Sequence, residues 1–324
     1  ELGLSYPTYD NSDNYLGDVT LINGRLNQKG TIKQEGGISN WSFAAAVEID
    51  KDIFLGGTIN FYNGDYKRNR DYWEEDIYNN YPSSVLLDPI DPATADFRTF
   101  YFNDIIKWDI SGFGASIGLL AKVDENINIG VTVKTPTKFN VKEIYLVDGY
   151  SHFGNNVEFI LDPPIENQYE YDITTPFEFN VGAVYSIDDL TFSADAKIID
   201  YSSIEFTKGF SNLDRERKNN EISDIFKTVV NLHAGVEYYI PRTAIALRGG
   251  FMYLPSAFKD DSSDFDKKFA TAGIGFTTRN NLTFNLAYAY GWWKDIGDNY
   301  DTNLSRTYQD LSRSNLMIGI KYNF

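Results

Sequence analysis

Cys and His, the residues that most often carry nucleophilic and acid–base chemistry, are scarce in this sequence, and its many carboxylates are interpreted as paired or solvated charges in preference to acid–base groups. The chain has no Cys and two His, His152 and His233, which lie far apart in the sequence. Without Cys there is no thiol nucleophile, no disulfide and no Cys–zinc site. Because no Ser–His–Asp or carboxylate–His set can be assembled, we expect no catalytic residue, no metal and no cofactor.

Clustered carboxylates and glycines are the other candidates for chemistry. Acidic clusters lie at 10–14, 260–266 and 295–301, and carboxylate oxygens are ligands that Ca²⁺ accepts. None has the EF-hand spacing, so we interpret them as solvated loops in preference to sites for ions that bridge lipopolysaccharide. The Gly-rich segment 112–118 lacks the following helix and acidic residue of a nucleotide-binding fingerprint, which favours glycines within a strand.

The composition argues against nucleic acid as a partner. The chain of 324 residues has a formal net charge of −17, whereas a phosphate-binding surface needs clustered Lys and Arg. Aromatic residues make up 16% of the chain, so the charge fits solvated loops of an ordered protein better than disorder. No apolar run of about 18 residues is present, but a membrane-spanning strand needs only about 9–11 residues, with every second one apolar.

The elements that would position these residues show a period of two. In 282–292 one face carries large apolar and aromatic side chains, and the other carries Thr, Asn, Ala and Gly. Small residues on the second face suit a barrel lumen better than the water-facing side of a sandwich. The charged residues on that second face are expected to pair across the lumen; they are Glu48, Glu178, Asp195, Lys197, Glu237, Arg248 and Lys321.

Connections between the expected strands alternate between short and long. The short ones are 51–52, 124–126, 188–189, 241–243 and 280–281. The long ones are about 71–104, 146–172, 206–227, 255–267 and 295–313. This alternation is typical of an outer-membrane barrel, which has tight periplasmic turns and long extracellular loops. Counting strands back from the end places Phe324 at the periplasmic rim.

We therefore predict an all-β fold, a transmembrane antiparallel up-and-down β-barrel that forms a single domain over 1–324. About twelve strands are expected, at 1–8, 36–50, 53–70, 105–123, 126–145, 174–187, 190–205, 228–240, 243–254, 268–278, 282–294 and 314–324. Aromatic residues near the strand ends are candidates for interfacial girdles; they are Trp41, Trp108, Tyr238, Tyr253, Trp292 and Trp293.

Three segments, 111–139, 175–206 and 234–258, resemble hairpins of FadL/TodX-like outer-membrane transporters of long-chain fatty acids and other hydrophobic compounds. The first contains Thr135–Pro136, the second ends near Tyr201–Ser202, and the third reads AGVEYY followed by RGGFMYLP. Segment 36–66 is similar to a Bacteroidota-type branch. The resemblance implies a fourteen-stranded barrel with an N-terminal hatch that carries Asn-Pro-Ala. This sequence has no Asn-Pro-Ala, so we expect the hatch and two strands to be absent from the chain.

The resemblance also implies that two outer loops, here 71–104 and 146–172, form a groove that captures hydrophobic ligands. Apolar residues on such loops need an explanation. The candidate ligand-binding residues are Tyr81, Val85, Leu86, Leu87, Ile90, Phe153, Val157, Phe159, Ile160 and Leu161. The alternative is that these residues pack the two loops onto each other, and both interpretations can hold together.

Passive transport of long-chain fatty acids or other hydrophobic small molecules across the bacterial outer membrane is the resulting prediction. The expected partners are a hydrophobic ligand, outer-membrane lipid and lipopolysaccharide, with no nucleic acid, and the chain is expected to be a monomer. The alternative is a non-transport barrel subunit of an outer-membrane secretion or surface assembly. A barrel enzyme would need a nucleophile–His pair, and a soluble β-protein would be found in the cytosol without detergent.

Overall fold

The computed structural model describes residues 2–278, 282–298 and 306–322. Phe324 and the predicted turn at 280–281 lie outside these residues. The described chain divides into two compact units. Unit 1 comprises 1–39, 62–111 and 140–171, and unit 2 comprises 40–61, 112–139 and 172–324.

Strands dominate the described chain. They are β1 (Tyr6–Tyr9), β2 (Tyr15–Val19), β3 (Asn27–Asp50), β4 (Ile53–Glu75), β5 (Phe97–Lys122), β6 (Ile127–Lys134), β7 (Lys138–Phe153), β8 (Glu158–Ile160), β9 (Ile165–Thr174), β10 (Glu178–Ile187), β11 (Leu190–Asp200), β12 (Glu205–Lys208), β13 (Thr228–Tyr239), β14 (Ile245–Leu254), β15 (Lys267–Thr277), β16 (Leu282–Asp298) and β17 (Arg306–Tyr322). One α-helix, α1 (Asn212–Ile225), and the 3₁₀ turns η1 (Pro92–Thr94), η2 (Gly154–Asn156) and η3 (Tyr201–Ser203) complete the described elements.

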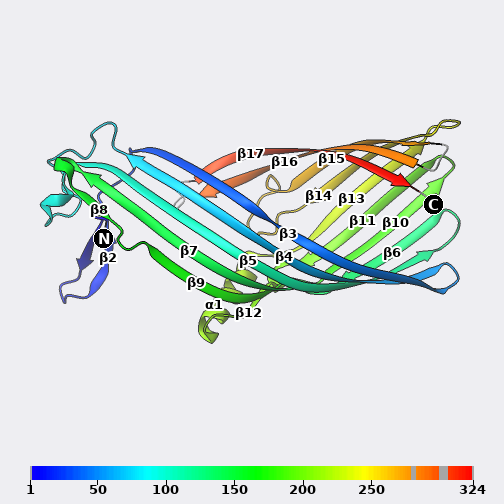
Figure 1. The fold of residues 1–324 in the computed structure, drawn as a ribbon, viewed down its shortest axis with the longest axis horizontal. Helices are drawn as coiled ribbons and strands as arrows, with labels where there is room; N and C mark the ends of the chain where they lie inside the picture. The colour runs from blue at the N-terminus through cyan, green and yellow to red at the C-terminus, as the bar shows by residue number, and fades with distance from the viewer. Residues whose placement is uncertain (1, 279–281, 299–305, 323–324) are drawn as a thin grey trace. The chain divides into compact units, whose positions relative to one another are not determined.

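In unit 2 the strands form an antiparallel meander in which sequence neighbours lie side by side (Figure 1). β10 pairs with β11, and the pairing continues through β13, β14, β15 and β16 to β17. β10 also pairs with β6, which pairs with the end of β5. The short turns contain residues with positive φ, Asp52 at 62°, Asp188 at 49° and Arg242 at 62°. Tight hairpins favour this geometry because it matches the twist of the strands.

The strands of unit 2 have one apolar face and one face of small and polar residues. On β16 the apolar face holds Phe284, Leu286 and Tyr288, which are 42–44% exposed. On the other face, which we call the polar face, Ala289 is 5% exposed. An exposed apolar face along an antiparallel sheet suits lipid, because paired strands satisfy each other's backbone polar groups. The predicted all-β fold with period-two faces is confirmed.

Two predicted strands, 126–145 and 174–187, are each interrupted by a Thr-Pro pair. Residues 135–137 separate β6 from β7, and 175–177 separate β9 from β10. Pro has no N–H to donate to the ladder, so both strands lose a sheet hydrogen bond here. Thr137 and Thr175 join the two interruptions, because the Thr137 N–H donates to Thr175 Oγ1 at 2.9 Å and the Thr175 N–H to the Thr137 carbonyl at 3.0 Å.

The prediction of a barrel strand at 1–8 is wrong. Residues Tyr6–Tyr9 pair only with β2, as a separate two-stranded sheet in unit 1. The reason is local, since Pro7 lacks an N–H and the Asp10 carboxylate accepts from the N–H groups of Ser12 at 2.7 Å and Asn14 at 2.9 Å. This Asx-type turn reverses the chain after a few residues.

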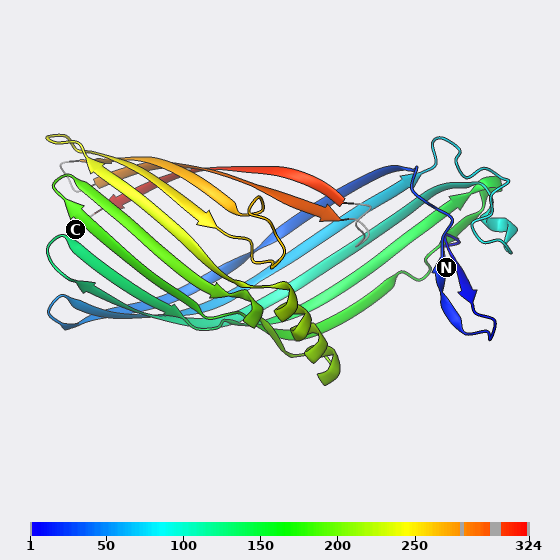
Figure 2. The same cartoon turned by 180° about the vertical axis from the view of Figure 1, so that it is seen from behind.

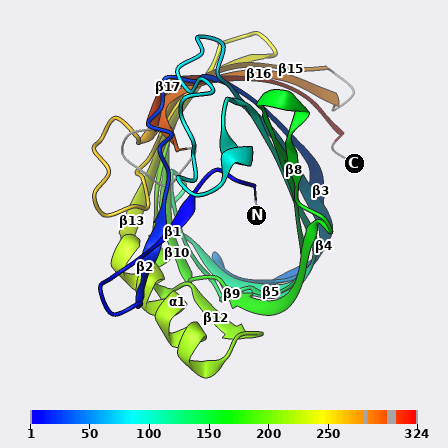
Figure 3. The same ribbon diagram turned by 90° about the vertical axis from the view of Figure 1, so that its left-hand side faces the viewer.

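The long connections are partly structured. β4 continues to Glu75 and β5 begins at Phe97, so the first connection is 76–96, inside the predicted 71–104. The predicted loop 206–227 contains α1, whose N-terminus is capped by Ser211. Asn219 holds this helix beside β12 through two hydrogen bonds with the Phe206 backbone, at 2.8 and 3.1 Å (Figure 3).

No helix in the described part of the chain is long and apolar enough to cross a membrane.

Candidate functional site

The two predicted loops of the ligand groove meet in unit 1 around a small apolar core. Tyr81, Leu87, Phe97 and Phe153 are buried together, with exposed fractions of 0–5%. The partly buried residues that pack against them include Val85, Val157 and Phe159. We call these seven residues the loop cluster. The Phe97 ring lies 6.2 Å from that of Tyr81 and 5.7 Å from that of Phe153, both edge to face.

Hydrogen bonds in the connections hold the loop cluster in place. The Asp76 carboxylate accepts from the N–H groups of Asn80 at 2.8 Å and Tyr81 at 2.7 Å. The Tyr81 hydroxyl accepts from the Asn23 N–H at 2.9 Å and donates to the Gly24 carbonyl at 3.0 Å. The Asp76 N–H donates to the Arg98 carbonyl at 2.9 Å, so the chain segments around residues 23, 81 and 97 are tied together. Such buried polar groups have partners because an unpaired one would cost about 1–3 kcal/mol.

The ten predicted ligand-binding residues divide into packed and exposed sets. Tyr81, Leu87 and Phe153 lie in the core, Val85, Val157 and Phe159 pack against it, and Leu161 is 8% exposed. Leu86 forms an isolated bridge with Ala95. Ile90 and Ile160, by contrast, are 90% and 55% exposed. Most of the set thus packs the connections onto each other, and the exposed isoleucines remain available to a ligand.

Phe97 was not among the predicted residues, although it is 1% exposed and its ring contacts those of Tyr81 and Phe153. It stands at the first position of β5, directly after Asp96, whose φ is 59°. The sequence offered one signal for Phe97, a turn residue followed by an aromatic residue. Phe97 was missed because the same pattern also occurs within loops and so does not mark the start of a strand.

A buried carboxylate lies between two arginines in the same unit. Asp104 on β5 is completely buried. Its Oδ1 accepts from Arg68 Nη2 at 2.6 Å, and its Oδ2 accepts from Arg70 Nε, both on β4. The arginine side chains keep 32% and 27% of their surface exposed. Two cations against one carboxylate leave a net positive charge at this place, and the buried Arg68 Nε has no hydrogen-bond partner among the described residues.

Nearby aromatic and acidic side chains in unit 1 form a second polar group. Trp108 Nε1 donates to Glu143 Oε2 at 2.7 Å, and the Tyr171 hydroxyl donates to the same oxygen at 3.2 Å. The Tyr66 and Trp108 rings are 4.8 Å apart. Trp108, a predicted interfacial residue, thus makes a specific hydrogen bond within the protein.

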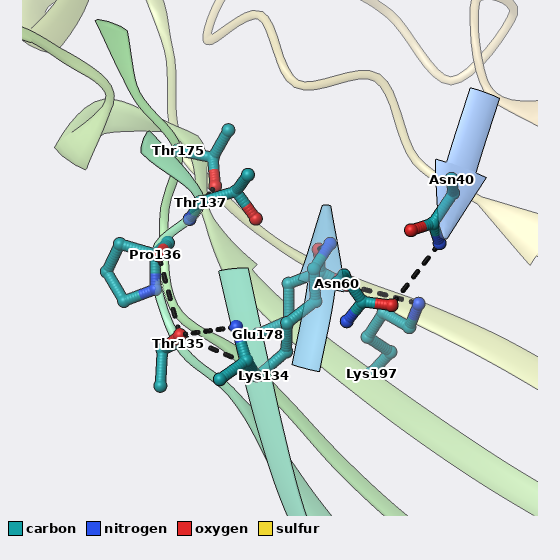
Figure 4. A network of polar contacts seen from close by, with 10 residues as sticks. Asn40, Asn60, Lys134, Thr135, Pro136, Thr137, Thr175, Glu178 and Lys197 are labelled. Atoms are coloured by element: carbon teal, nitrogen blue, oxygen red, sulfur yellow. Dashed lines mark hydrogen bonds and ion pairs between the residues drawn. The ribbon is translucent and has the colours of Figure 1, made fainter. Parts of the chain in front are cut away.

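The polar face of unit 2 carries ion pairs between neighbouring strands (Figure 4). Glu178 on β10 accepts from Lys134 on β6 at 2.6 Å and from Lys197 on β11 at 3.2 Å. His233 Nδ1 lies 2.7 Å from Asp195 Oδ1. The prediction of pairing across the lumen is wrong for Glu178, Lys197, Asp195, Glu237 and Arg248, whose ion-pair partners lie on neighbouring strands. Directly opposite residues on adjacent strands have Cβ atoms about 4.5–5.5 Å apart, so the nearest partner is along the wall.

Arg248 shows how a glycine permits a longer reach. It donates from Nε to Glu237 on β13 and from Nη1 to Asn285 on β16, the latter at 2.7 Å. It crosses β15 to do so, over Gly275. A Cβ on Gly275 would lie 3.0 Å from both Arg248 Nη1 and Asn285 Oδ1. The absence of a side chain there leaves room for the guanidinium.

The comparisons agree with this architecture. The family model described as "Outer membrane protein transport protein (OMPP1/FadL/TodX)" matches residues 55–324. A solved structure of a Pseudomonas aeruginosa FadL homologue is 15% identical, over 89% of this chain and 67% of that one, with a TM-score of 0.55. The CymD monoaromatic hydrocarbon channel is 11% identical, over 92% of this chain and 78% of that one, with a TM-score of 0.52. At these identities the two structures show the fold alone. No curated protein matches the sequence.

Proposed function

Because the chain belongs to the family of outer membrane transport proteins that includes FadL and TodX, we propose that it carries long-chain fatty acids or other hydrophobic small molecules passively across the outer membrane. The family and the fold make it an outer-membrane β-barrel transport protein and not an enzyme. The assignment of 36–66 to a Bacteroidota-type branch stays a prediction. So do the single-domain organisation, the monomeric state and the contacts with lipid and lipopolysaccharide.

The observation that carries the proposal is the loop cluster of unit 1. Its core is buried, while Ile90 and Ile160 on the same two connections leave 90% and 55% of their surface exposed. The loop cluster holds these apolar side chains in contact with water. Covering them with a hydrophobic ligand is favourable by roughly 25 cal/mol per Å² of apolar surface removed from water. A hydrophobic molecule would therefore partition first onto this surface.

The arginine pair supports a ligand with a carboxylate. Arg68 and Arg70 lie on β4, the strand that leads into the first connection, and with Asp104 they leave a net positive charge. From Arg70 to the end of β4 at Glu75 the strand rises about 17 Å at roughly 3.3 Å per residue. A long alkyl chain can span that length, with its tail at the loop cluster and its carboxylate near a guanidinium.

Uptake of radiolabelled oleate tests the proposal in cells that have no other fatty-acid transporter. The variant I90D/I160D changes only exposed side chains, so it should fold, and we expect uptake to fall at least fivefold. The matched control is L213D on α1, where the leucine is 77% exposed in unit 2, and it should transport normally. Unchanged uptake in I90D/I160D would overturn the role of the loop surface.

The non-transport alternative makes a different prediction for the same cells. A subunit of a secretion or surface assembly would copurify with partner proteins in stoichiometric amounts. Its deletion would leave oleate uptake unchanged.

A further inference from the structure

The connection 255–266 in unit 2 is fastened to the sheet and to α1 (Figure 2). Its first half joins the end of α1, because the Lys227 N–H donates to the Ala257 carbonyl and the Lys259 N–H to the Ile225 carbonyl, each at 2.9 Å. Its second half is held by Asp266, which is 6% exposed and accepts from the Ser256 N–H at 2.9 Å and from the Tyr253 hydroxyl. These hydrogen bonds hold the connection in one position against α1 and the sheet.

A cavity of about 700 Å³ is lined on one side by this connection. It falls in the range of roughly 300–1,000 Å³ that small-molecule sites occupy. Most of the lining is aromatic or aliphatic, and its rings are Tyr201, Phe226, Phe258, Phe265 and Trp293. The Phe226 and Phe258 rings are 4.9 Å apart and join the end of α1 to the connection.

The charged groups of the lining differ in their partners. Lys294 forms an ion pair with Asp264 at 3.0 Å, and Asp261 accepts a hydrogen bond from the Ser256 hydroxyl. Asp295, the other carboxylate of the lining, accepts from the Ile296 N–H at 2.9 Å. Lys267 places its ammonium 5.4 Å from the centre of the Trp293 ring. Among the described residues Lys267 forms no ion pair; it contacts the aromatic face of Trp293 and lines the cavity.

We propose that this cavity is a second ligand site, which binds an amphiphile with an alkyl or aromatic body and a single carboxylate. The body lies among Phe226, Phe258 and Phe265, and the carboxylate pairs with Lys267 beside Trp293. The site lies wholly within unit 2 and shares no residue with the loop cluster. It goes beyond the transport proposal, because it assigns ligand chemistry to a connection that the groove does not include.

Adjacent tryptophans on opposite faces of β16 make the proposal testable. Side chains alternate along a strand, so Trp293 faces the cavity while Trp292 lies on the apolar face. The probe is 12-bromododecanoate, whose bromine quenches tryptophan fluorescence on contact, added to the full chain in lipid nanodiscs. We expect saturable quenching that is lost in Trp293→Phe and kept in Trp292→Phe. Saturable quenching that survives Trp293→Phe would overturn the site.

The charge is tested separately. Lys267→Met should weaken 12-bromododecanoate binding about tenfold, the equivalent of one charge-assisted contact, and leave 12-bromododecanol binding unchanged. Equal loss for acid and alcohol would overturn the carboxylate assignment. Ala257→Trp, which fills the cavity, should abolish saturable quenching by both probes, and quenching that persists would count against the cavity. I90D/I160D should not affect this quenching, so the two proposals fail independently.

Discussion

Unit 1 and unit 2 use charged residues in different ways. In unit 1, Asp104 is buried between Arg68 and Arg70, and its side chain is 1% exposed. In unit 2, Glu178 also contacts two cations, but its side chain keeps 20% of its surface exposed and the two lysines keep 34% and 36%. The carboxylate is thus desolvated in unit 1 and partly solvated in unit 2, while the cations of both clusters keep about a third of their surface exposed. We therefore expect the free energy lost on removing each carboxylate to depend on how deeply that carboxylate is buried, more than on its distance from the cations.

Asp104→Asn should produce the largest effect. The substitution keeps the shape but leaves two guanidinium groups without their shared carboxylate. Removing one partner of a buried ion pair costs about 3–5 kcal/mol. We expect unit 1 to open locally, which hydrogen exchange at the amides of 97–111 would report. Exchange equal to that of the natural chain would show that water enters and screens the arginines.

Leu87→Ala should have the second largest effect, because it removes a buried apolar side chain from the loop cluster of unit 1. Leu87 has no exposed surface, and truncation of a buried leucine costs about 2–5 kcal/mol. Limited proteolysis of the connections at 76–96 and 154–164 is the measurement, and cleavage should accelerate. Ile90→Ala on the same connection is the control, and its cleavage rate should stay the same. If both variants were cleaved equally fast, the cluster would not order the loops.

Glu178→Gln should have the smallest effect. Partly exposed ion pairs contribute about 0–1 kcal/mol, so thermal unfolding in detergent should shift by only a few degrees. Added salt should reduce the difference between Glu178→Gln and the natural chain, since it screens exposed charges. If Glu178→Gln destabilised the protein as much as Asp104→Asn does, burial would not explain the difference between the two ion-pair clusters.

The sequence predicted most of the large sheet, for a reason that particular strands illustrate. β10, β13 and β16 begin within four residues of their predicted positions, and their faces follow the period of two. Asp52 and Asp188 mark tight turns with positive φ. These features depend on neighbouring residues only, so they can be seen in one sequence.

The loop cluster was harder to predict. The apolar residues of the two connections were identified, but not which of them would be buried. Leu87 is completely buried and Ile90, three residues later, is almost completely exposed. Connections have no periodic pattern that marks an inner face, and Phe97 reaches the core through contacts with residues distant in the sequence. The cavity under 255–266 depends on Phe226 and Phe258 meeting, which no local signal indicates.

The sequence alone determined the fold class, the family and the two faces of the strands, because alternation and turn chemistry are local properties. Only the tertiary structure decided the partners of the charged residues. Glu178 meets Lys134 and Lys197 because the registers of β6, β10 and β11 place Lys134 directly opposite Glu178, and Lys197 opposite Asn180, two residues further along β10 on the same face. The register between strands also allows Arg248 to reach Asn285 across Gly275. Such contacts arise from the alignment of separate strands, and that alignment is set by the whole sheet.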